Sequence, residues 1–264
     1  MSRDSVGGTF AVAAVLCIVC SLLVSSAAVV LRPLQNANRA AYEKENILLA
    51  AGKVDEEAFK FVIELGTANL HAEGTVVAAN YNQRSAAKNP DQSVEINSAN
   101  DIAGIKRREK YGRVYAFRDA NNKVTHLVLP VYGKGLWSTL YGFLAIQADG
   151  KTSTGLTFYD HKETPGLGGE IESEKFKASW RPDRNLQLFD EDGNVIIEVT
   201  KGAAIQPSHQ VDGISGATIT SRGVSNLVRY WLSDEGYGPV LEILRAGDGQ
   251  LEQKLMALKV GSDG

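Results

Sequence analysis

The amino-acid sequence predicts an α+β protein: a single N-terminal transmembrane helix followed by one extramembrane domain with a largely antiparallel sheet flanked by helices. Three observations lead to this prediction. An apolar stretch near the N-terminus carries no charged residue, alternating segments separated by turn residues begin at Gly112, and an amphipathic helix follows from about Ile219 to Ser233.

The composition is that of a folded chain. Of its 264 residues, 44% are hydrophobic and 22% are charged, which is typical of globular proteins and unlike disordered ones. The formal net charge is −3. Because nucleic-acid-binding proteins usually carry a basic surface, this charge argues against nucleic acid as a partner.

The N-terminal stretch is long enough to span a membrane. No charged residue occurs from Ser5 to Leu31, and a transmembrane helix needs about 20 apolar residues. The transmembrane helix is predicted over 10–31, after a short tail over 1–9. The stretch exceeds the apolar core of a typical signal peptide, which favours an uncleaved anchor; cleavage near Ser26-Ala27-Ala28 is the alternative.

Residues 32–110 are predicted to form a helical and loop connecting region packed on the domain. Pro33 is expected to end the membrane helix, because proline disfavours a helical conformation in the preceding residue. Gly52 is a suitable residue for the end of a further helix. The predicted elements are helices over 36–51 and 54–65, a polar loop over 80–98, and a solvated basic run at Lys106-Arg107-Arg108.

Residues 111–246 are predicted to form the main part of the domain, and 247–264 a polar C-terminal tail. Asp149-Gly150 and Asp192-Gly193 are typical of hairpin turns. The predicted strands cover 113–118, 124–132, 140–147, 154–159, 186–189 and 195–199, and the predicted helices cover 172–180, 219–233 and 237–245.

The start of the helix at 219–233 has the properties of an anion site. Its apolar residues recur at helical spacing and define one buried stripe: Val224, Leu227, Val228, Trp231 and Leu232. Free N–H groups and the positive end of the helix dipole therefore lie near Thr218. Hydroxyl side chains gather at Ser215, Thr218, Thr220 and Ser221. They fit either a bound phosphate or a set of helix caps.

Arg222 adds a charge at this helix start. A cation in the first turn opposes the helix dipole unless an anion is present. We therefore expect its guanidinium to pair with a phosphate; the alternative is that it points to solvent or to an acidic residue such as Asp212.

The segment Asp212-Gly-Ile-Ser-Gly-Ala-Thr218 resembles the flavinylation motif D-x-x-[ST]-G-A-[ST] at every specified position. In that family a flavin transferase joins FMN to the last hydroxyl residue by a phosphoester bond. The resemblance implies that Thr218 is the acceptor and that Asp212, Ser215, Gly216 and Ala217 complete the motif. Thr220 and Ser221 lie outside the acceptor position, so they are expected to be phosphate-side or capping hydroxyls.

Further segments are similar to a family of anchored flavin subunits. They occur in the same order over nearly the full length: Leu31-Arg-Pro-Leu-Gln35, Asn46–Gly52, Gly133–Ser138 and His161–Gly168. The chain resembles the C-type subunit of the sodium-translocating NADH:quinone reductase and, less fully, the related G-type subunit of the Rnf complex. The resemblance implies that residues 111–246 are an FMN-binding domain.

Two segments are expected to lie along the flavin ring. Pro165-Gly166 suits a type II turn, and the following glycines allow a close backbone approach, although an ordinary surface turn would have the same residues. Trp137 is either a wall of the flavin site or a core residue. The predicted flavin contacts in these segments are Glu163, Thr164, Gly166, Leu167, Gly168, Trp137 and Ser138.

The sequence predicts no metal site. His161 and His209 have no second ligand at metal-binding spacing. Cys17 and Cys20 share a face of the predicted membrane helix, where they are either small apolar contact residues or a pair of cluster ligands.

The resemblance implies an electron-transfer role without catalytic residues of its own. The chain would carry covalent FMN in a bacterial inner-membrane complex that couples NADH oxidation and quinone reduction to sodium export, with the other subunits and a flavin transferase as partners. No G-x-G-x-x-G motif for NADH is present. The alternatives are the FMN-bearing subunit of the Rnf ferredoxin:NAD complex and a non-redox membrane scaffold.

The expected orientation depends on which signal is followed. One cationic residue, Arg3, precedes the span, and Arg32, Arg39 and Lys44 follow it. The positive-inside rule would then place the domain in the cytoplasm. The family topology implies a periplasmic domain, and we follow it because the charge difference is small.

Overall fold

The computed structural model describes residues 6–53, 56–78 and 81–260. The chain divides into two units, Met1–Glu45 and Asn46–Gly264, each of which is described by itself.

The first unit consists of most of helix α1, which runs from Val6 to Ala50. Within the described part of the chain, α1 is the one helix long and apolar enough to cross a membrane. The prediction that the helix ends at Arg32-Pro33 is wrong, because Pro33 lies inside α1. A proline in a helix removes a single backbone hydrogen bond, and the residues on either side of Pro33 remain helical.

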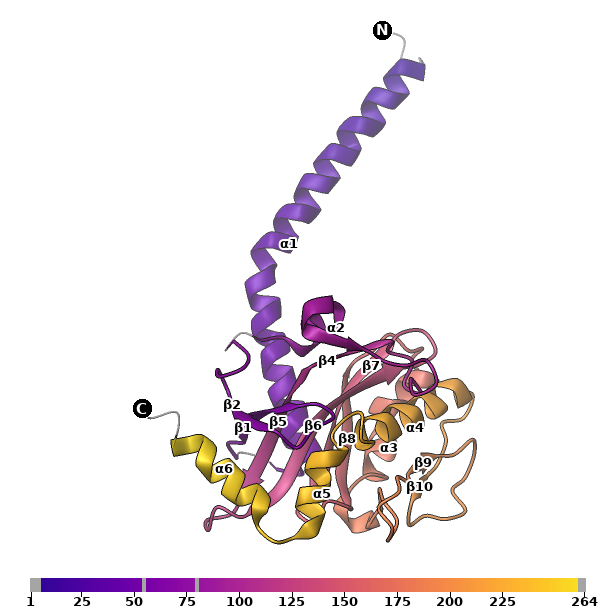
Figure 1. Cartoon of the computed structure of the whole chain (residues 1–264). Coiled ribbons are helices and arrows are strands. Elements are labelled where there is room, and N and C mark those ends of the chain that lie inside the picture. The colour runs from indigo at the N-terminus through magenta and orange to yellow at the C-terminus, as the bar shows by residue number, and fades with distance from the viewer. Residues whose placement is uncertain (1–5, 54–55, 79–80, 261–264) are drawn as a thin grey trace. The chain divides into compact units, whose positions relative to one another are not determined.

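The second unit is built on a six-stranded sheet with the order β2-β1-β5-β6-β7-β8 (Figure 1). All neighbouring strands in it are antiparallel, as predicted. Its strands are β1 (Phe59–Glu64), β2 (Leu70–Ala72), β5 (Tyr111–Arg118), β6 (Val124–Lys134), β7 (Thr139–Gln147) and β8 (Ser153–Asp160).

The helix predicted over 54–65 is wrong where the structure describes it. Residues 54 and 55 lie outside the described part, and Phe59–Glu64 forms β1 instead. Phe61, Val62 and Ile63 are fully buried, so this short run is covered on both faces of the sheet. From the sequence alone, a short continuous apolar run can be either a buried strand or part of a buried helix. Here the run forms a strand because its backbone pairs with β5.

The remaining elements surround the sheet. The helices are α2 (Gln83–Lys88), α3 (Glu174–Ala178), α4 (Thr218–Leu232), α5 (Gly238–Ala246) and α6 (Gln250–Val260). The short strands are β3 (Ser93–Glu95), β4 (Arg107–Glu109), β9 (Glu198–Val199) and β10 (Gln210–Val211). The expected loop over 80–98 and the expected tail therefore contain regular structure. The expected strands over 186–199 are reduced to isolated bridges and β9.

Helix α4 packs against β6 (Figure 1) and is fixed there by its buried stripe. The indole N–H of Trp231 donates to the carbonyl of Tyr132 at 2.7 Å. A side chain at Gly133 would lie 2.5 Å from Leu227, so glycine lets the helix approach the strand closely. This packing fixes where α4 begins.

The C-terminal end of α1 belongs to the second unit and packs on the sheet. Ile47 and Ala50 are buried against Phe117, Val128 and other side chains of the sheet. The Thr157 hydroxyl also donates to the backbone carbonyl of Asn46 at 3.1 Å. The last turn of α1 is therefore part of the folded domain.

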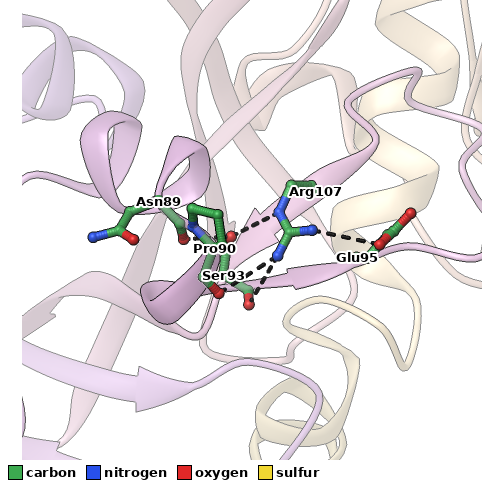
Figure 2. A network of polar contacts seen from close by, with 5 residues as sticks. All are labelled: Asn89, Pro90, Ser93, Glu95 and Arg107. Carbon is green, nitrogen blue, oxygen red and sulfur yellow. Dashed lines mark hydrogen bonds and ion pairs between the residues drawn. The ribbon is translucent and has the colours of Figure 1, made fainter.

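The basic run at 106–108 is only in part the solvated face that was predicted, because Lys106 is exposed whereas Arg107 is half-buried and Arg108 is buried. Arg107 Nε donates to the hydroxyl of Ser93 at 2.9 Å, and its terminal nitrogens reach Pro90 O and Glu95 at 3.5 Å (Figure 2). Arg108 is only 7% exposed. Arg107 links β4 to β3, and Arg108 forms an ion pair with Glu235 at 3.9 Å. Contacts between residues so far apart in the sequence leave no trace in the local pattern.

Glu109 is a fully buried acid. Its ionisation should make the stability of the domain depend on pH. Its carboxylate accepts hydrogen bonds from Tyr132 at 2.6 Å and from Gln83 at 2.8 Å. Burial raises the pKa of Glu109, and these hydrogen bonds only partly counteract it. The folded state therefore binds a proton more tightly than the unfolded state does.

Glu109→Gln should flatten the pH dependence of stability. Because the folded pKa is raised, the Glu109 contribution to the unfolding free energy decreases as pH rises above the ordinary value of 4.5. The variant should gain stability relative to the parent as pH increases, measured by denaturant unfolding of the detergent-solubilised chain. Glu95→Gln, at an 81% exposed side chain, is the control. An unchanged pH slope in Glu109→Gln would contradict this interpretation.

Candidate functional site

The sheet topology brings two of the predicted flavin segments to one end of the sheet. Strands β6 and β7 pair up to Lys134 and Thr139, so the connection 135–138 lies at that end. Strand β8 pairs with β7 up to Tyr141 and Asp160, and the segment 161–169 follows directly. The start of α4 lies at the same end of the sheet, because Glu163 is hydrogen-bonded both to the connection 135–138 and to Thr220 of α4.

Thr218 is the first residue of α4 and is exposed. The residue before it, Ala217, is the N-cap, and no side chain caps the helix. Gly216 has φ of +72°, a conformation that favours glycine and turns the chain into the helix. Among the residues that the structure describes, the N-terminal N–H groups of α4 therefore have no side-chain acceptor, and Thr218 is the first residue of this helix turn.

The other hydroxyls of the motif region have different environments. Ser215 is exposed. Ser221 is buried, and its hydroxyl accepts from the N–H of Ile214 at 3.0 Å, which closes the loop that precedes α4. Thr220 is fully buried and donates to Glu163 at 2.7 Å. Because α4 has no side-chain cap, Thr220 and Ser221 do not serve as the capping hydroxyls considered above.

Asp212, the first residue of the motif, holds a neighbouring loop. Its carboxylate accepts from the N–H of Ala204 at 2.8 Å. In the part of the chain that the structure describes, Asp212 forms no ion pair with Arg222, whose guanidinium is exposed and has no hydrogen bond or ion pair. The structure therefore contradicts the alternative that Arg222 pairs with Asp212, whereas the exposed guanidinium is as the other alternative, that Arg222 points to solvent, expects.

The carboxylate of Glu163 joins three separate segments. It accepts from the N–H groups of Leu136 at 3.2 Å, Trp137 at 2.9 Å and Ser138 at 3.2 Å, and from the Thr220 hydroxyl. The side chain of Glu163 is only 5% exposed. The loop 136–138, the segment that starts at His161 and the first turn of α4 are thus fixed to one another by a single side chain.

These hydrogen bonds determine the ionisation of Glu163. Burial alone would raise its pKa, but the hydrogen bonds from Thr220 and from the three N–H groups outweigh burial and leave the pKa below its ordinary value. Glu163 is therefore a carboxylate at neutral pH. All its donors come from the protein, so it acts here by positioning the loop and the helix.

The turn predicted at Pro165-Gly166 is confirmed. Gly166 has φ of +74°, and the N–H of Leu167 donates to the carbonyl of Thr164 at 3.1 Å. A side chain at Gly168 would lie 2.6 Å from the Thr220 hydroxyl. Glycine is therefore required at 168 for the segment to approach α4.

Three large apolar side chains are exposed at this end of the sheet. Trp137 is 66% exposed, Leu167 44% and Ile219 47%. The alternative that Trp137 is a core residue is therefore wrong. The Ser138 hydroxyl accepts from the N–H of Lys162 at 2.8 Å, which ties the loop that carries Trp137 to the segment that carries Leu167.

A cavity of about 280 Å³ opens on another side of α4. It is lined by Glu198, Val199, Thr200, Lys201, Thr218, Arg222, Ser225, Asn226 and Arg229. Thr218 and Arg222 were predicted from the sequence as site residues, whereas Lys201 and Arg229 were not. The seven-residue spacing of Arg222 and Arg229 on one helix was an available signal, whereas Lys201 approaches only through tertiary packing.

Comparison with known proteins agrees with this geometry. Residues 135–233 match the FMN-binding domain family. The chain is similar to the C-type subunit (NqrC) of the Na⁺-translocating NADH-quinone reductase of Haemophilus ducreyi, with 41% identity over 94% of this chain and 98% of the relative. The corresponding protein of Vibrio vulnificus is 42% identical over 93% of this chain and 98% of the relative.

A solved structure extends the likeness to the fold. The crystal structure of Shewanella oneidensis NqrC aligns with a TM-score of 0.70 and 31% identity, covering 79% of this chain and 98% of that one. These matches extend over nearly the whole length of each relative, and they agree with the resemblance to the reductase rather than to the Rnf complex. This chain therefore belongs to the NqrC family of the Na⁺-translocating NADH-quinone reductases.

Proposed function

We propose that this chain is the FMN-bearing electron-transfer subunit of a Na⁺-translocating NADH-quinone reductase and that FMN is joined to Thr218 by a phosphoester bond. The observation that carries the proposal is the exposed Thr218 hydroxyl at the start of α4, which has no side-chain cap, within the matched FMN-binding region. When bound, FMN supplies the electron-transfer chemistry, and the protein supplies position and electrostatics.

The residues at the start of α4 fit a phosphate diester. A diester on Thr218 keeps one negative charge, which the free N–H groups and the positive end of the helix dipole stabilise. Arg222 has no partner among the described residues and lines the same cavity as Thr218. A guanidinium can hold two phosphate oxygens, so we assign Arg222 to the phosphate.

The exposed apolar side chains fit the flavin ring. Trp137 and Leu167 would contact the ring and exclude water from it, since aromatic and aliphatic surfaces favour a planar apolar partner. Ser138, Thr164, Gly166 and Gly168 shape the two segments that carry these side chains. Glu163 fixes the positions of both segments and of the start of α4 relative to one another.

The same proposal covers the cellular setting. The relatives are named as subunits of a sodium-translocating complex, so the partners proposed for this chain are the other membrane subunits, and a flavin transferase during maturation. The chain would be anchored in the bacterial inner membrane by α1, with the domain in the periplasm, and the complex would export sodium.

Intact mass spectrometry of the purified chain tests the attachment. The expected result is a mass increase of one FMN less one water, and a fluorescent band after denaturing electrophoresis. A chain with the unmodified mass and no fluorescence, purified from cells that contain a flavin transferase, would refute covalent attachment.

Arg222→Gln should lower the fraction of chain that carries covalent flavin, and Arg222→Glu should lower it further. Loss of a charge-assisted phosphate contact removes about 1.5–3 kcal/mol, and a carboxylate there also repels the phosphate. The flavin-to-protein absorbance ratio of the denatured chain measures the effect. Lys175→Gln, at an exposed residue of α3, is the matched control. Equal flavin content in both Arg222 variants would show that the arginine does not hold the phosphate.

A further inference from the structure

We infer that His161 is a positioning residue of the flavin site, whose neutral imidazole sets the direction of the Glu163 backbone and so the place of the Glu163 carboxylate. The inference rests on the proposed FMN site between the loop 135–138, the segment 161–169 and α4. His161 is not one of the flavin contacts predicted from the sequence, and its contacts give it a role there.

The ring of His161 joins the two ends of the segment 161–172. Its side chain is only 10% exposed. Nδ1 accepts from the backbone N–H of Glu163 at 3.1 Å, and Nε2 lies 3.0 Å from a carboxylate oxygen of Glu172. Glu172 is the last residue of the 3₁₀ helix Gly168–Glu172. A single ring therefore contacts both the beginning and the end of the segment that carries the turn at Gly166.

These contacts define which ring nitrogen carries the proton. A backbone N–H can only donate, so Nδ1 offers its lone pair and carries no proton. The neutral imidazole then has its proton on Nε2, beside the Glu172 carboxylate, whose negative charge favours a proton there. The Nε2–H does not point directly at the Glu172 oxygen. Glu172 therefore acts through its charge, and Nδ1 makes the directed hydrogen bond.

The hydrogen bond at Nδ1 determines the direction of Glu163. A side-chain acceptor that binds the N–H two residues later fixes the backbone between them, as asparagine and aspartate do in Asx turns. With its N–H held by His161, Glu163 directs its carboxylate to the N–H of Trp137 at 2.9 Å and to the hydroxyl of Thr220 at 2.7 Å. His161 therefore acts on the loop 135–138 and on α4 through Glu163.

The residues on either side of His161 are fixed independently. Asp160, the last residue of β8, forms an ion pair with Arg84. The N–H of Lys162 donates to the hydroxyl of Ser138 at 2.8 Å. Because both neighbours are held, the backbone at His161 has little freedom. The contact between Nδ1 and the N–H two residues later is therefore a fixed feature of the segment.

The first measurement uses the full-length Thr218→Ala chain in detergent, so that it does not depend on bound flavin. Nitrogen-15 NMR should show His161 with an unprotonated Nδ1 and a protonated Nε2, the signals being assigned by their loss in His161→Phe. Deuterium exchange of peptides that cover 161–169 should become about tenfold faster in His161→Phe, the effect of one lost hydrogen bond on local opening. A ring with its proton on Nδ1, or unchanged exchange, would overturn the inference.

The second measurement compares variants of the mature chain with FMN attached. His161→Phe removes both nitrogens, so the visible absorption spectrum of bound FMN should shift toward that of FMN in water. His161→Asn keeps an acceptor for the N–H two residues later but does not reach Glu172, so it should restore the parental spectrum. His126→Phe is the control, at a half-buried histidine near the opposite end of β6 whose ring contacts Thr125 at 3.1 Å, and it should leave the spectrum unchanged.

A merely structural histidine would give a different result. A His161→Phe chain that loses stability but keeps the parental flavin spectrum, or an equal spectral shift in His161→Asn and His161→Phe, would contradict the inference. The two proposals fail separately. A wild-type chain without covalent flavin refutes the attachment and leaves the NMR and exchange measurements valid, whereas a fluorescent wild-type chain whose His161→Phe variant keeps its spectrum refutes only the role of His161.

Discussion

Thr218→Ala should abolish covalent flavin, and Thr218→Ser should retain it. Alanine lacks the oxygen that would form the phosphoester, whereas serine keeps a hydroxyl at the same place. The expected readout is loss of the fluorescent band on a denaturing gel and loss of the FMN mass. The fold should survive, because Thr218 is exposed and the N-cap of α4 is Ala217. Exposed substitutions of this kind usually change stability by less than about 0.5 kcal/mol.

The choice of control follows from the structure. Thr220 lies close in sequence, but it is buried and bonded to Glu163, so Thr220→Ala would disturb the site for a structural reason. Ser215 is exposed and its hydroxyl has no bond among the described residues. Ser215 is a specified position of the motif, so Ser215→Ala tests recognition of the motif, and the control outside the motif is Ser208→Ala, at an exposed hydroxyl, which should keep full flavin content. If Thr218→Ala still fluoresces and Ser215→Ala does not, the acceptor is Ser215 and the assignment is wrong.

Much of this arrangement could be predicted because it is local. The apolar stripe of α4 follows helical spacing, and Val224, Leu227 and Trp231 are all fully buried as expected. The hairpins β5–β6 and β7–β8 follow from alternation and turn residues. The turn at Gly166 follows from the conformational preferences of proline and glycine.

The parts that could not be predicted depend on contacts between distant residues. Phe61–Ile63 looks helical until β5 is placed beside it. Arg108 looks solvated until the domain buries it. Lys201 has no motif of its own and approaches α4 only because Ser225 binds the strand before it. Glu163 could be assigned to the flavin region from its motif, but its four protein donors come from segments far apart in the sequence.

Glu163→Ala should cause the largest loss of stability among single substitutions at the site. It would leave the N–H groups of Leu136, Trp137 and Ser138 and the Thr220 hydroxyl without their acceptor. A buried donor left unsatisfied costs about 1–3 kcal/mol; this applies in full to the Thr220 hydroxyl, whereas the three N–H groups are only partly buried. Allowing for non-additivity and for water entering the space, we expect a loss of about 3 kcal/mol or more. Denaturant unfolding of the detergent-solubilised chain measures this loss.

Glu163→Gln separates the charge of this side chain from its hydrogen bonding. The amide oxygen can still accept from Trp137 and Ser138, and the Thr220 hydroxyl can rotate to accept from the new NH₂ group. Only the N–H of Leu136 then faces a donor, so the expected loss is smaller, about 1–3 kcal/mol. Glu170→Gln, a half-buried acid of the same segment, is the control and should change little.

The pH dependence gives an independent check on the role of Glu163. Because its folded pKa lies below the ordinary value of 4.5, its contribution to stability is present above that pH and is lost as pH falls through the folded pKa. The parent chain should therefore lose stability in acid more steeply than Glu163→Gln does. If Glu163 positions the walls of the flavin site, the absorption spectrum of bound FMN should also shift in Glu163→Gln toward that of free FMN in water. A variant with lower stability but an unaltered flavin spectrum would show that Glu163 supports the fold without shaping the site.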